Sequence, residues 1–588
     1  AGDLLLNVIR AGHYFGEWEP LFDVPRAYAI RAAEPAVCYT MSGELFLAMV
    51  HRSRTMAQAF GTILRDRQRI FAAFDLFRLL PYYRALEPAL HPLVRDDVAI
   101  DTEGLLYAVR RLPENVTSTF AYLLTDVVPA AYGDPGAVFA PVNTLSRRRE
   151  VWEMMPGKSL LLLRSGRSDL IDFVSCLCLY AVEARKIRKR LQEPRYMAAL
   201  REAGATNREA LDLPFDAEET AALRRAWGEE TERRLHEIVR HREMFSIDIR
   251  RQTRDYNSRS TEQWSHQLGT ATKRLLGADP SDLSADIDVH IISSNTHSVS
   301  NCLNPWFCTH KRAVLSWAHA ENHPAVSERW TEEQDLTYAV VRDYFTEHPD
   351  RLADSRRVER ESGIHRIEQT VSTGVQVQLV DTNAVAYRSV DPGLRVSKKP
   401  RRALIVNIDY AFGEQAQHIM RNLLVLYGRN IRSISFLGKA GALVGRRGDI
   451  VVPSAFVEQT TELFQPVPVP DQAVIAELGA ALPDRSVHTG TMLTVDGTLL
   501  QNRLMLHFYR HLWDAVGIEM EGSHYFRQVV ESRELGVIPE DTQLRFFYYV
   551  SDVPLEHAST LSSRLAPTEG VPPLYAITRS LLRRILSD

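Results

Sequence analysis

The sequence predicts a multidomain α/β protein, and three observations support that prediction. A chain of 588 residues is too long for one hydrophobic core and is expected to divide into about two to four domains. Its long middle part shows the spacing of apolar residues that is typical of helices. After about residue 371, short apolar runs alternate with helical segments, which is the pattern of an α/β sheet domain. We therefore expect a β-containing segment over 1–80, a helix-rich region over 81–370 and an α/β domain over 371–588.

Composition and charge argue against several classes of partner. Apolar residues make up 45% of the chain, charged residues 24% and aromatic residues 9%, as in ordinary soluble globular proteins. The net charge of −4 gives no indication of a nucleic acid or a membrane surface as a partner. The local basic runs Arg147–Arg149 and Lys186–Arg190 are interpreted as solvated helix faces.

Cysteine usage favours a reducing compartment. The five cysteines are odd in number and lack C-x-x-C spacing, which argues against a disulfide framework or a zinc site. The most apolar stretch, Leu170–Ala184, contains Asp172 and Glu183 and is too short to span a bilayer. No signal peptide opens the sequence, although its first residue is not methionine. We therefore expect a cytoplasmic protein without a metal or cofactor, in which Cys176 and Cys178 are core residues.

The first two segments are read from their local patterns. Residues 3–33 carry short apolar runs between glycines and prolines, as in compact β structure, and the pattern becomes helical from Gly43 to about Leu80. In the middle region, 214–254 is expected to be exposed helix. Strand-like islands interrupt the region at Ser159–Leu163 and Val289–Ser293. The polar run after the second island, through residue 301, is either a ligand loop or a loop that satisfies its own backbone.

Strands and glycine turns alternate in the C-terminal segment. A loop or linker is expected over Asp391–Arg401. Gly413 follows the first predicted strand, and Gly438, Lys439 and Gly441 end the second. Such turns expose backbone N–H groups and permit a ligand to approach closely, although each alone is equally well explained as a tight turn. The predicted strands are Ala403–Ile408, Ile431–Leu437, Ile450–Val452 and Phe546–Val550.

Two carboxylates further along the chain suggest a reaction. Cleavage of a purine N-glycosidic bond needs a group that holds the ribose hydroxyls and an acid that protonates the departing base at N7. Glu521 and Asp552 are the candidates, because each lies beside a strand-like run behind the glycine turns. We expect them to hold the ribose and to protonate the base.

The motifs around these residues resemble the nucleoside phosphorylase and nucleosidase superfamily over about 401–560. The resemblance implies a three-layer α/β domain with a mixed sheet, a purine nucleoside or nucleotide substrate, and a homo-oligomer. It also implies that Glu521 grips the ribose 2′- and 3′-hydroxyls and that Asp552 protonates N7. The matching segments are Leu437–Leu443 with Gly448–Val452, Thr489–Asp496, Gly517–Gly522 and Val550–Asp552.

The resemblance assigns further residues to the site. Glu414 is the available candidate for the base that activates water in hydrolytic relatives. The residues expected to bind substrate are Gly413, Gly438, Lys439, Gly441, Glu519, Met520 and Ser551.

Departures from the family pattern refine the expected chemistry. Phe436 stands where phosphorylases carry a phosphate-binding arginine, which favours hydrolysis over phosphorolysis. Lys439 would bind the phosphate of a nucleotide, or is an exposed loop residue. The aromatic residue that stacks on the base is absent near Thr498, and Phe456 or Phe412 would substitute. Two alternatives therefore remain open, a non-catalytic nucleoside sensor and a phosphorylase that uses Lys439 or Arg446.

The N-terminus carries a second resemblance. Phe15-Gly16-Glu17 and Pro25-Arg26-Ala27 resemble the phosphate-binding cassette of cyclic-nucleotide-binding domains, which implies a β-roll with C-terminal helices, here truncated on its N-terminal side. By this resemblance Arg26 would neutralise the cyclic phosphate, Glu17 would bind the ribose 2′-hydroxyl, and Ala27 favours cAMP. Glu19 and Pro20 depart from the pattern, so a fold retained without ligand is the alternative. The expected function is a purine nucleosidase that a cyclic nucleotide regulates.

Overall fold

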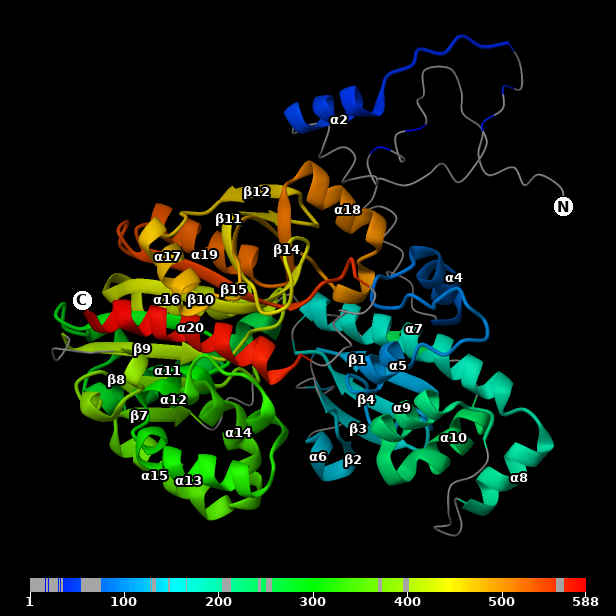
Figure 1. Cartoon of the computed structure of the whole chain (residues 1–588), viewed down its shortest axis with the longest axis horizontal. Helices are drawn as coiled ribbons and strands as arrows, with labels where there is room; N and C mark the ends of the chain where they lie inside the picture. Colours follow the sequence, from blue (N-terminus) through cyan, green and yellow to red (C-terminus); the bar gives the residue numbers. More distant parts are fainter. Residues whose placement is uncertain are drawn as a thin grey trace.

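The chain forms two α/β units, which are seen side by side in Figure 1. The structure is a computed structural model, and it describes residues 35–53, 76–126, 134–145, 149–164, 166–203, 213–241, 245–249, 256–367, 373–394, 401–556 and 565–587, with a few isolated residues between them. Among the helices of these ranges, none combines the length and the apolar character that crossing a bilayer requires.

The smaller unit contains a five-stranded sheet in the order β2-β3-β4-β1-β5. β1 runs parallel to both β4 and β5, whereas β3 is antiparallel to β2 and β4. The predicted strand island Ser159–Leu163 is confirmed as β4. Its strands are β1 (Ala121–Thr125), β2 (Ala140–Val142), β3 (Glu150–Met155), β4 (Lys158–Leu162) and β5 (Ser246–Ile249). Its helices are α4 (Leu76–Leu86), α5 (Thr102–Val109), α6 (Pro135–Val138), α7 (Gly166–Arg190), α8 (Pro194–Ala203), α9 (Ala217–Trp227) and α10 (Thr231–Arg240).

Helix α7 is the central element of this unit. It is buried along most of its length, and Cys176 and Cys178 lie in the hydrophobic core, as predicted. The interpretation of the two basic runs as solvated faces is wrong for Arg149 and Lys186. Arg149 is buried between Asp169 and Asp172 on α7, and Lys186 is buried against Glu183. A buried cation needs such a partner. The partners of Arg149 are distant along the chain and leave no local signal, whereas Glu183 is three residues before Lys186 on the same helix.

The larger unit contains a ten-stranded mixed sheet in the order β12-β11-β13-β14-β10-β6-β9-β8-β7, with β15 pairing to β10 and β11. A mixed sheet is the expected architecture, and each of the predicted C-terminal strands is present. The strands are β6 (Asp288–Ser293), β7 (Ile364–Ile367), β8 (Val377–Asp381), β9 (Ala403–Ile408), β10 (Ile431–Ala442), β11 (Ile450–Glu458), β12 (Leu463–Pro466), β13 (Val487–Thr494), β14 (Ala515–Glu519) and β15 (Gln543–Asp552).

Strand β6 places part of the middle region inside this sheet. It runs parallel to β9 on one side and to β10 on the other. The division expected at residue 371 falls between β7 and β8, which pair with each other. The region 81–370 thus holds strands of two sheets in addition to its helices. We propose that the larger unit begins near residue 256.

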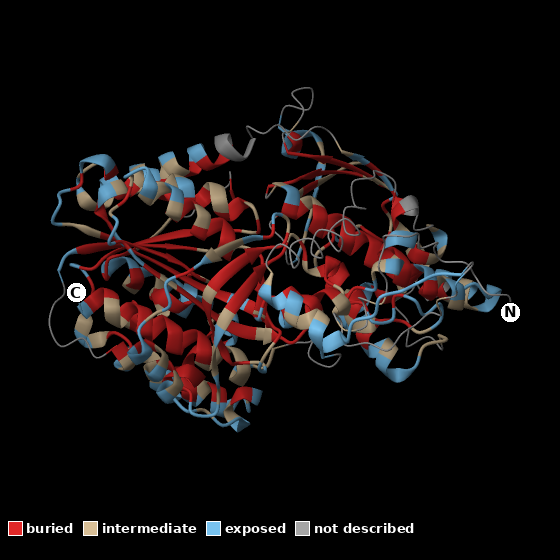
Figure 2. Cartoon of the chain, turned by 90° about the horizontal axis from the view of Figure 1, so that it is seen from above, coloured by how far each residue is buried: buried red, intermediate tan, exposed pale blue. Residues whose placement is uncertain are grey.

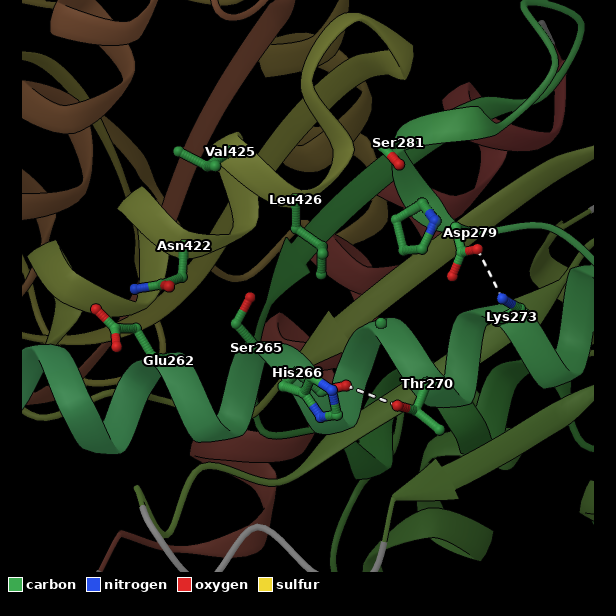
Figure 3. Close-up of a pocket in the computed structure, with 12 residues that line it drawn as sticks. Glu262, Ser265, His266, Thr270, Lys273, Asp279, Ser281, Asn422, Val425 and Leu426 are labelled. Atoms are coloured by element: carbon green, nitrogen blue, oxygen red, sulfur yellow. Dashed lines mark hydrogen bonds and ion pairs between the residues drawn. The ribbon is translucent and has the colours of Figure 1, made fainter.

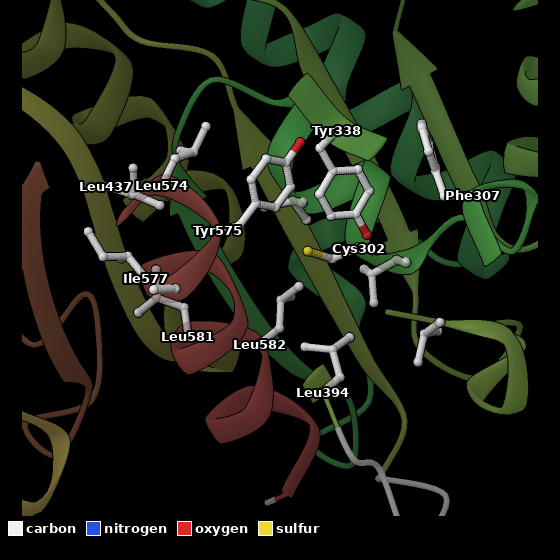
Figure 4. Close-up of a cluster of buried hydrophobic side chains, with 14 of the residues drawn as sticks. Cys302, Phe307, Tyr338, Leu394, Leu437, Leu574, Tyr575, Ile577, Leu581 and Leu582 are labelled. Atoms are coloured by element: carbon white, nitrogen blue, oxygen red, sulfur yellow. The ribbon is translucent and has the colours of Figure 1, made fainter. Parts of the chain in front are cut away.

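Helices cover both faces of the larger sheet, and Figure 2 shows the strands as a buried layer. One hydrophobic cluster includes residues of α11, α16 and α19, and another includes residues of α12 to α14, α17 and α20. In the second cluster Tyr338 and Tyr575 stack face to face, as Figure 4 shows, and their ring centroids lie 4.1 Å apart. The helices are α11 (Tyr256–Leu276), α12 (His297–Leu303), α13 (Trp306–Ala320), α14 (Glu333–Glu347), α15 (Pro349–Glu361), α16 (Gln415–Tyr427), α17 (Gln472–Ala481), α18 (Arg503–Leu512), α19 (Gly522–Glu534) and α20 (Pro567–Ser587).

The N-terminal segment is described only in part. Helix α2 (Gly43–Arg52) confirms the helical pattern predicted from Gly43, and Val50 packs in a cluster with residues of α18. Gly16 is described and has a φ of +84°. The other residues of the expected cassette, Glu17, Arg26 and Ala27, lie outside the described residues, and so does most of the expected β-roll.

Candidate active site

Three strands of the larger sheet meet at Gly441. This residue of β10 pairs with Ile518 of β14 on one side and with Asp552 of β15 on the other. A Cβ atom on Gly441 would lie 2.9 Å from Asp552 Oδ2 and 3.0 Å from Ile518 Cγ1. A side chain is therefore excluded here, and the strand ends that carry Glu521 and Asp552 are each paired with β10 at this residue. Neighbouring strands lie about 4.8 Å apart.

Asp552 is a buried carboxyl group with one satisfied oxygen. Its side chain is fully buried. Oδ1 accepts a hydrogen bond of 2.7 Å from Ser551 Oγ, whereas Oδ2 has no hydrogen-bond partner within the described chain. Burial raises the pKa of Asp552 to about 6, and the Ser551 hydrogen bond, Arg447 and Lys439 oppose that shift. A carboxyl group with this pKa can donate a proton near neutral pH.

The Glu519-Met520-Glu521 sequence joins β14 to α19. Glu519 is buried and accepts hydrogen bonds from the backbone N–H groups of Glu521, at 2.8 Å, and Gly522, at 2.5 Å. Its other oxygen accepts from Thr494 Oγ1. Burial raises the pKa of Glu519. Both oxygens of Glu519 therefore accept hydrogen bonds within the protein and hold the start of α19. This geometry gives Glu519 a role in positioning the backbone and does not direct its carboxylate to a ligand.

Glu521 faces the loop that follows β9. Its Oε1 accepts a hydrogen bond of 3.0 Å from the backbone N–H of Gly413. Burial raises the pKa values of Tyr410, Tyr525 and Tyr548, and the charge of Glu521 adds to each of these shifts. The buried hydroxyl of Tyr410 has no hydrogen-bond partner among the described residues. An ionised carboxylate only accepts hydrogen bonds, so Glu521 is suited to accept them from the hydroxyls of a polyhydroxyl ligand.

Lys439 is an exposed residue of β10, two positions before Gly441. Its side chain keeps exposed surface, yet surrounding protein atoms desolvate the ammonium group and lower its pKa, while Asp552 opposes the shift. Nζ lies 6.0 Å from the centre of the Tyr549 ring. Lys439 also contributes to lowering the pKa of His297, which burial reduces to about 4. An exposed ammonium group at this place could contact a small anion.

Gly438, Phe436 and Phe456 are packed in the interior of the larger unit. A Cβ atom on Gly438 would lie 2.4 Å from Phe436 Cε1, and the Phe436 ring packs against Tyr525 and Tyr548. Phe456 is fully buried among Phe526 and Phe546.

Two residues considered for the base pocket contact other parts of the chain. Phe412 packs against the hydrophobic cluster that contains Val50. Thr498 Oγ1 lies 3.1 Å from the hydroxyl of Tyr107, which comes from the smaller unit. Tyr107 of the smaller unit therefore contacts Thr498, the position near which the family's stacking aromatic residue is expected.

Glu414 immediately precedes α16, and its charge affects two histidines. Its charge opposes the lowering of the pKa values of His418 and His524. Its backbone N–H donates a hydrogen bond of 3.1 Å to Ser168 Oγ. Within the described residues, the Glu414 carboxylate makes no contact with Asp552. Its role as the base that activates water therefore stays a prediction.

Sequence reasoning missed Ser168, Tyr410 and Tyr107. Ser168 and Tyr107 lie in a region without recognised motifs, and only the docking of the two units brings them to this place. Tyr410 immediately precedes the Ala411-Phe412-Gly413 turn, so the presence of a polar aromatic residue beside a predicted glycine turn was an available signal. The polar run after β6 partly satisfies its own backbone through Ser294 and Asn295 side chains.

A surface recess lies elsewhere on the larger unit, between α11 and α16. It has a volume of about 660 Å³ and is lined by polar side chains such as Glu262, His266 and Asn422. Figure 3 shows the ion pair between Lys273 and Asp279 at one side of it. None of the site residues predicted from the sequence lines this recess.

Comparisons with known proteins give one family match and a set of remote structural similarities. A model for a family of unknown function (DUF6909) matches residues 76–587. None of the curated proteins matches the chain.

Two solved structures illustrate the remote similarities. A 5′-methylthioadenosine/S-adenosylhomocysteine nucleosidase from Colwellia psychrerythraea 34H, in complex with adenine, is 11% identical; the match covers 50% of this chain and 93% of that chain, with a TM-score of 0.26. The futalosine hydrolase of Helicobacter pylori strain 26695 is also 11% identical, with 52% and 99% covered and a TM-score of 0.28.

Proposed function

The chain belongs to the family of unknown function DUF6909, which spans residues 76–587, and we propose that it hydrolyses the N-glycosidic bond of a purine nucleoside or nucleotide. The observation that carries this proposal is the arrangement at Gly441. This residue pairs both with Asp552 and with the strand that leads into Met520-Glu521. The motif resemblance found in the sequence gives the arrangement its chemical interpretation.

Asp552 is proposed to be the general acid. When the bond between ribose C1′ and purine N9 breaks, its electron pair passes to the purine, and the Asp552 carboxyl supplies a proton to N7. The oxygen of water forms the new bond to C1′, and its proton leaves to solvent or to a base. The raised pKa of Asp552, about 6, keeps part of the carboxyl protonated near neutral pH. Ser551 orients the carboxyl through its 2.7 Å hydrogen bond.

Glu521 is proposed to hold the ribose hydroxyls. A carboxylate can accept two hydrogen bonds from vicinal hydroxyls, and those bonds strengthen as the ribose becomes positively charged. Glu519 holds the backbone of Glu521 by accepting its N–H hydrogen bond. Met520 is buried and has its terminal methyl group near Gly413, at 3.8 Å from a Cβ atom placed there.

Water is preferred to phosphate as the second substrate. Phe436 is buried in an aromatic cluster and offers no positive charge at the position where phosphorylases bind phosphate. Lys439 is exposed on β10 and is proposed to bind the phosphate of a nucleotide substrate. Regulation by a cyclic nucleotide, and assembly into a homo-oligomer, stay predictions from the sequence.

The test measures release of free base by chromatography. Wild type and Asp552→Asn are incubated with ATP, AMP, adenosine and inosine, with and without phosphate and with and without cAMP. Base release that does not depend on phosphate and is lost in Asp552→Asn supports the hydrolase. Release that requires phosphate would identify a phosphorylase. If wild type releases no base from any of these compounds, hydrolysis of these substrates is refuted, and binding without cleavage would identify a sensor.

Stimulation by cAMP is judged in the same assay. Acceleration that disappears in Arg26→Ala would support the cassette, whereas acceleration that persists in that variant would refute it.

A further inference from the structure

The first turn of α7, in the smaller unit, touches the loop that contacts Glu521. Ser168 is buried and its Oγ accepts a hydrogen bond of 3.1 Å from the backbone N–H of Glu414. A Cβ atom on Gly413 would lie 2.2 Å from Ser168 Oγ. Gly413 also has a φ of +54°, which favours glycine. Close approach of Ser168 is thus a second reason why only glycine fits at residue 413.

The same loop makes the contact to the proposed ribose-binding residue. Gly413 donates its backbone N–H to Glu521 Oε1, and the next residue, Glu414, donates its N–H to Ser168. Consecutive backbone N–H groups therefore link Ser168 of one unit to Glu521 of the other. A shift of the loop would move the N–H group that orients Glu521.

The contacts around Ser168 hold α7 in this place. Arg167 forms an ion pair of 2.9 Å with Asp496, and Tyr107 hydrogen-bonds Thr498. Leu499 of the larger unit is only 1% exposed and packs in the hydrophobic cluster of the smaller unit. Within the smaller unit, the first turn of α7 is fixed by Asp169, which accepts a 2.6 Å bond from the buried Arg149. The first turn of α7 is therefore held from both sides, as a fixed part of the junction seen in Figure 1.

We infer that Ser168 is a positioning residue of the nucleoside site, supplied by the smaller unit of the same chain. It fixes the Gly413–Glu414 loop, and the loop in turn orients Glu521 toward the ribose. The smaller unit thereby completes the site within one chain. This inference rests on the proposed function, because it assigns the consequence of the contact to ribose binding.

The test compares Ser168→Ala with Ser175→Ala. Both serines are buried on α7, but the Ser175 hydroxyl donates to Ile171 O within the helix and does not contact the Gly413 loop. Loss of the Ser168 acceptor is expected to raise KM about tenfold, the usual size of one buried hydrogen bond. It is also expected to lower kcat, because the bonds between Glu521 and the ribose strengthen in the transition state. Ser175→Ala is expected to leave KM unchanged. Equal KM values in the two variants would overturn the inference.

Amide hydrogen exchange separates this inference from the enzymatic proposal. Exchange in the peptide that contains Gly413 and Glu414 is expected to be faster in Ser168→Ala than in wild type, and unchanged in Ser175→Ala. This readout needs no substrate, so it tests the loop contact even if no base is released. Unchanged exchange in Ser168→Ala would refute the positioning role. Faster exchange in a protein that neither binds nor cleaves nucleosides would refute its link to ribose.

Discussion

Among single residues, Asp552 leads to the first prediction, which is that the rate of base release depends on pH. The proposed acid must be protonated, and its pKa is about 6, so kcat/KM is expected to fall as pH rises above that value. Asp552→Asn is expected to lower kcat about 10²- to 10⁴-fold, the usual contribution of a general acid. Rates of base release measured between pH 4.5 and 9, a range of about four and a half units around that pKa, test both expectations. A wild-type profile that is flat across pH 6 would exclude Asp552 as the acid.

The same residue predicts a change in stability. The pKa of Asp552 in the folded protein is raised from 3.8 to about 6, so its favourable contribution to folding is complete below pH 3.8 and is lost as pH rises through 6. The loss is on the order of 3 kcal/mol. Asp552→Asn is therefore expected to raise the free energy of unfolding at pH 8, with a smaller gain at pH 4.5. Urea denaturation at both pH values measures this, with the exposed Asp541→Asn as the control.

Gly441 predicts the effect of adding one methyl group beside the acid. In Gly441→Ala the new Cβ atom would meet Asp552 Oδ2 at 2.9 Å and Pro554 Cγ at 3.0 Å. We expect a loss of about 1–3 kcal/mol of stability from overpacking, and a fall in base release on the order of 100-fold from displacement of the acid. Gly479→Ala, on α17 with no atom within 4 Å of the new Cβ, is the control. Unaltered base release in Gly441→Ala would contradict the proposed site.

At the scale of elements, a buried ion cluster fastens α20 to the larger unit. Arg579 contacts Asp335 of α14 at 2.6 Å and Asp391 at 3.0 Å, and all three side chains are nearly inaccessible. Arg579→Met would leave two buried aspartates without their cation, which is expected to cost about 3–5 kcal/mol. Arg583→Met on the same helix, which breaks a partly exposed pair with Glu477, is expected to cost less than about 1 kcal/mol. Equal losses in urea denaturation would show that the cluster does not stabilise the helix.

Sequence patterns predict where individual strands and helices lie along the chain, but they do not predict which elements lie side by side in the fold. The runs Ala403–Ile408 and Val289–Ser293 were recognised as strands because buried strands are continuously apolar. That the second run lies beside the first was not predictable, since strand pairing depends on contacts across about a hundred residues and leaves no local signal. Ser168 could not be predicted for the same reason, because its contact with Glu414 joins residues that are distant along the chain. Motifs are sufficient to propose roles for Glu521 and Asp552, and those roles stay predictions. That Glu519 holds the start of α19 is visible only in its hydrogen bonds.

At the scale of the whole molecule, the junction of the two units can be locked. A Cβ atom on Gly497 would lie 2.7 Å from Ile171 Cγ2, which places the two Cβ atoms within about 4.2 Å, inside the range of a disulfide. Gly497 has an extended backbone that any residue adopts. In Ile171→Cys/Gly497→Cys, made with the exposed Cys38 replaced by serine, we expect oxidation to leave base release within about twofold of the reduced form, well below the effect of one hydrogen bond.

The lock distinguishes a fixed junction from a moving one. Oxidised protein that loses activity and regains it on reduction would show that the smaller unit must separate from the site during turnover. The single-cysteine variants, treated with the same oxidant, control for modification of either thiol alone.

The place of β6 between β9 and β10 also determines how the molecule can be divided. A fragment that begins after β6 would leave the facing edges of β9 and β10 without the strand that joins them, and such open edges associate with other chains. Residues 256–394 carry the missing strand, and residues 401–587 carry Glu521 and Asp552. Expressed separately, neither piece could form the complete sheet; brought together they would reconstitute it, so this unit can be divided into two complementary fragments at the segment between β8 and β9.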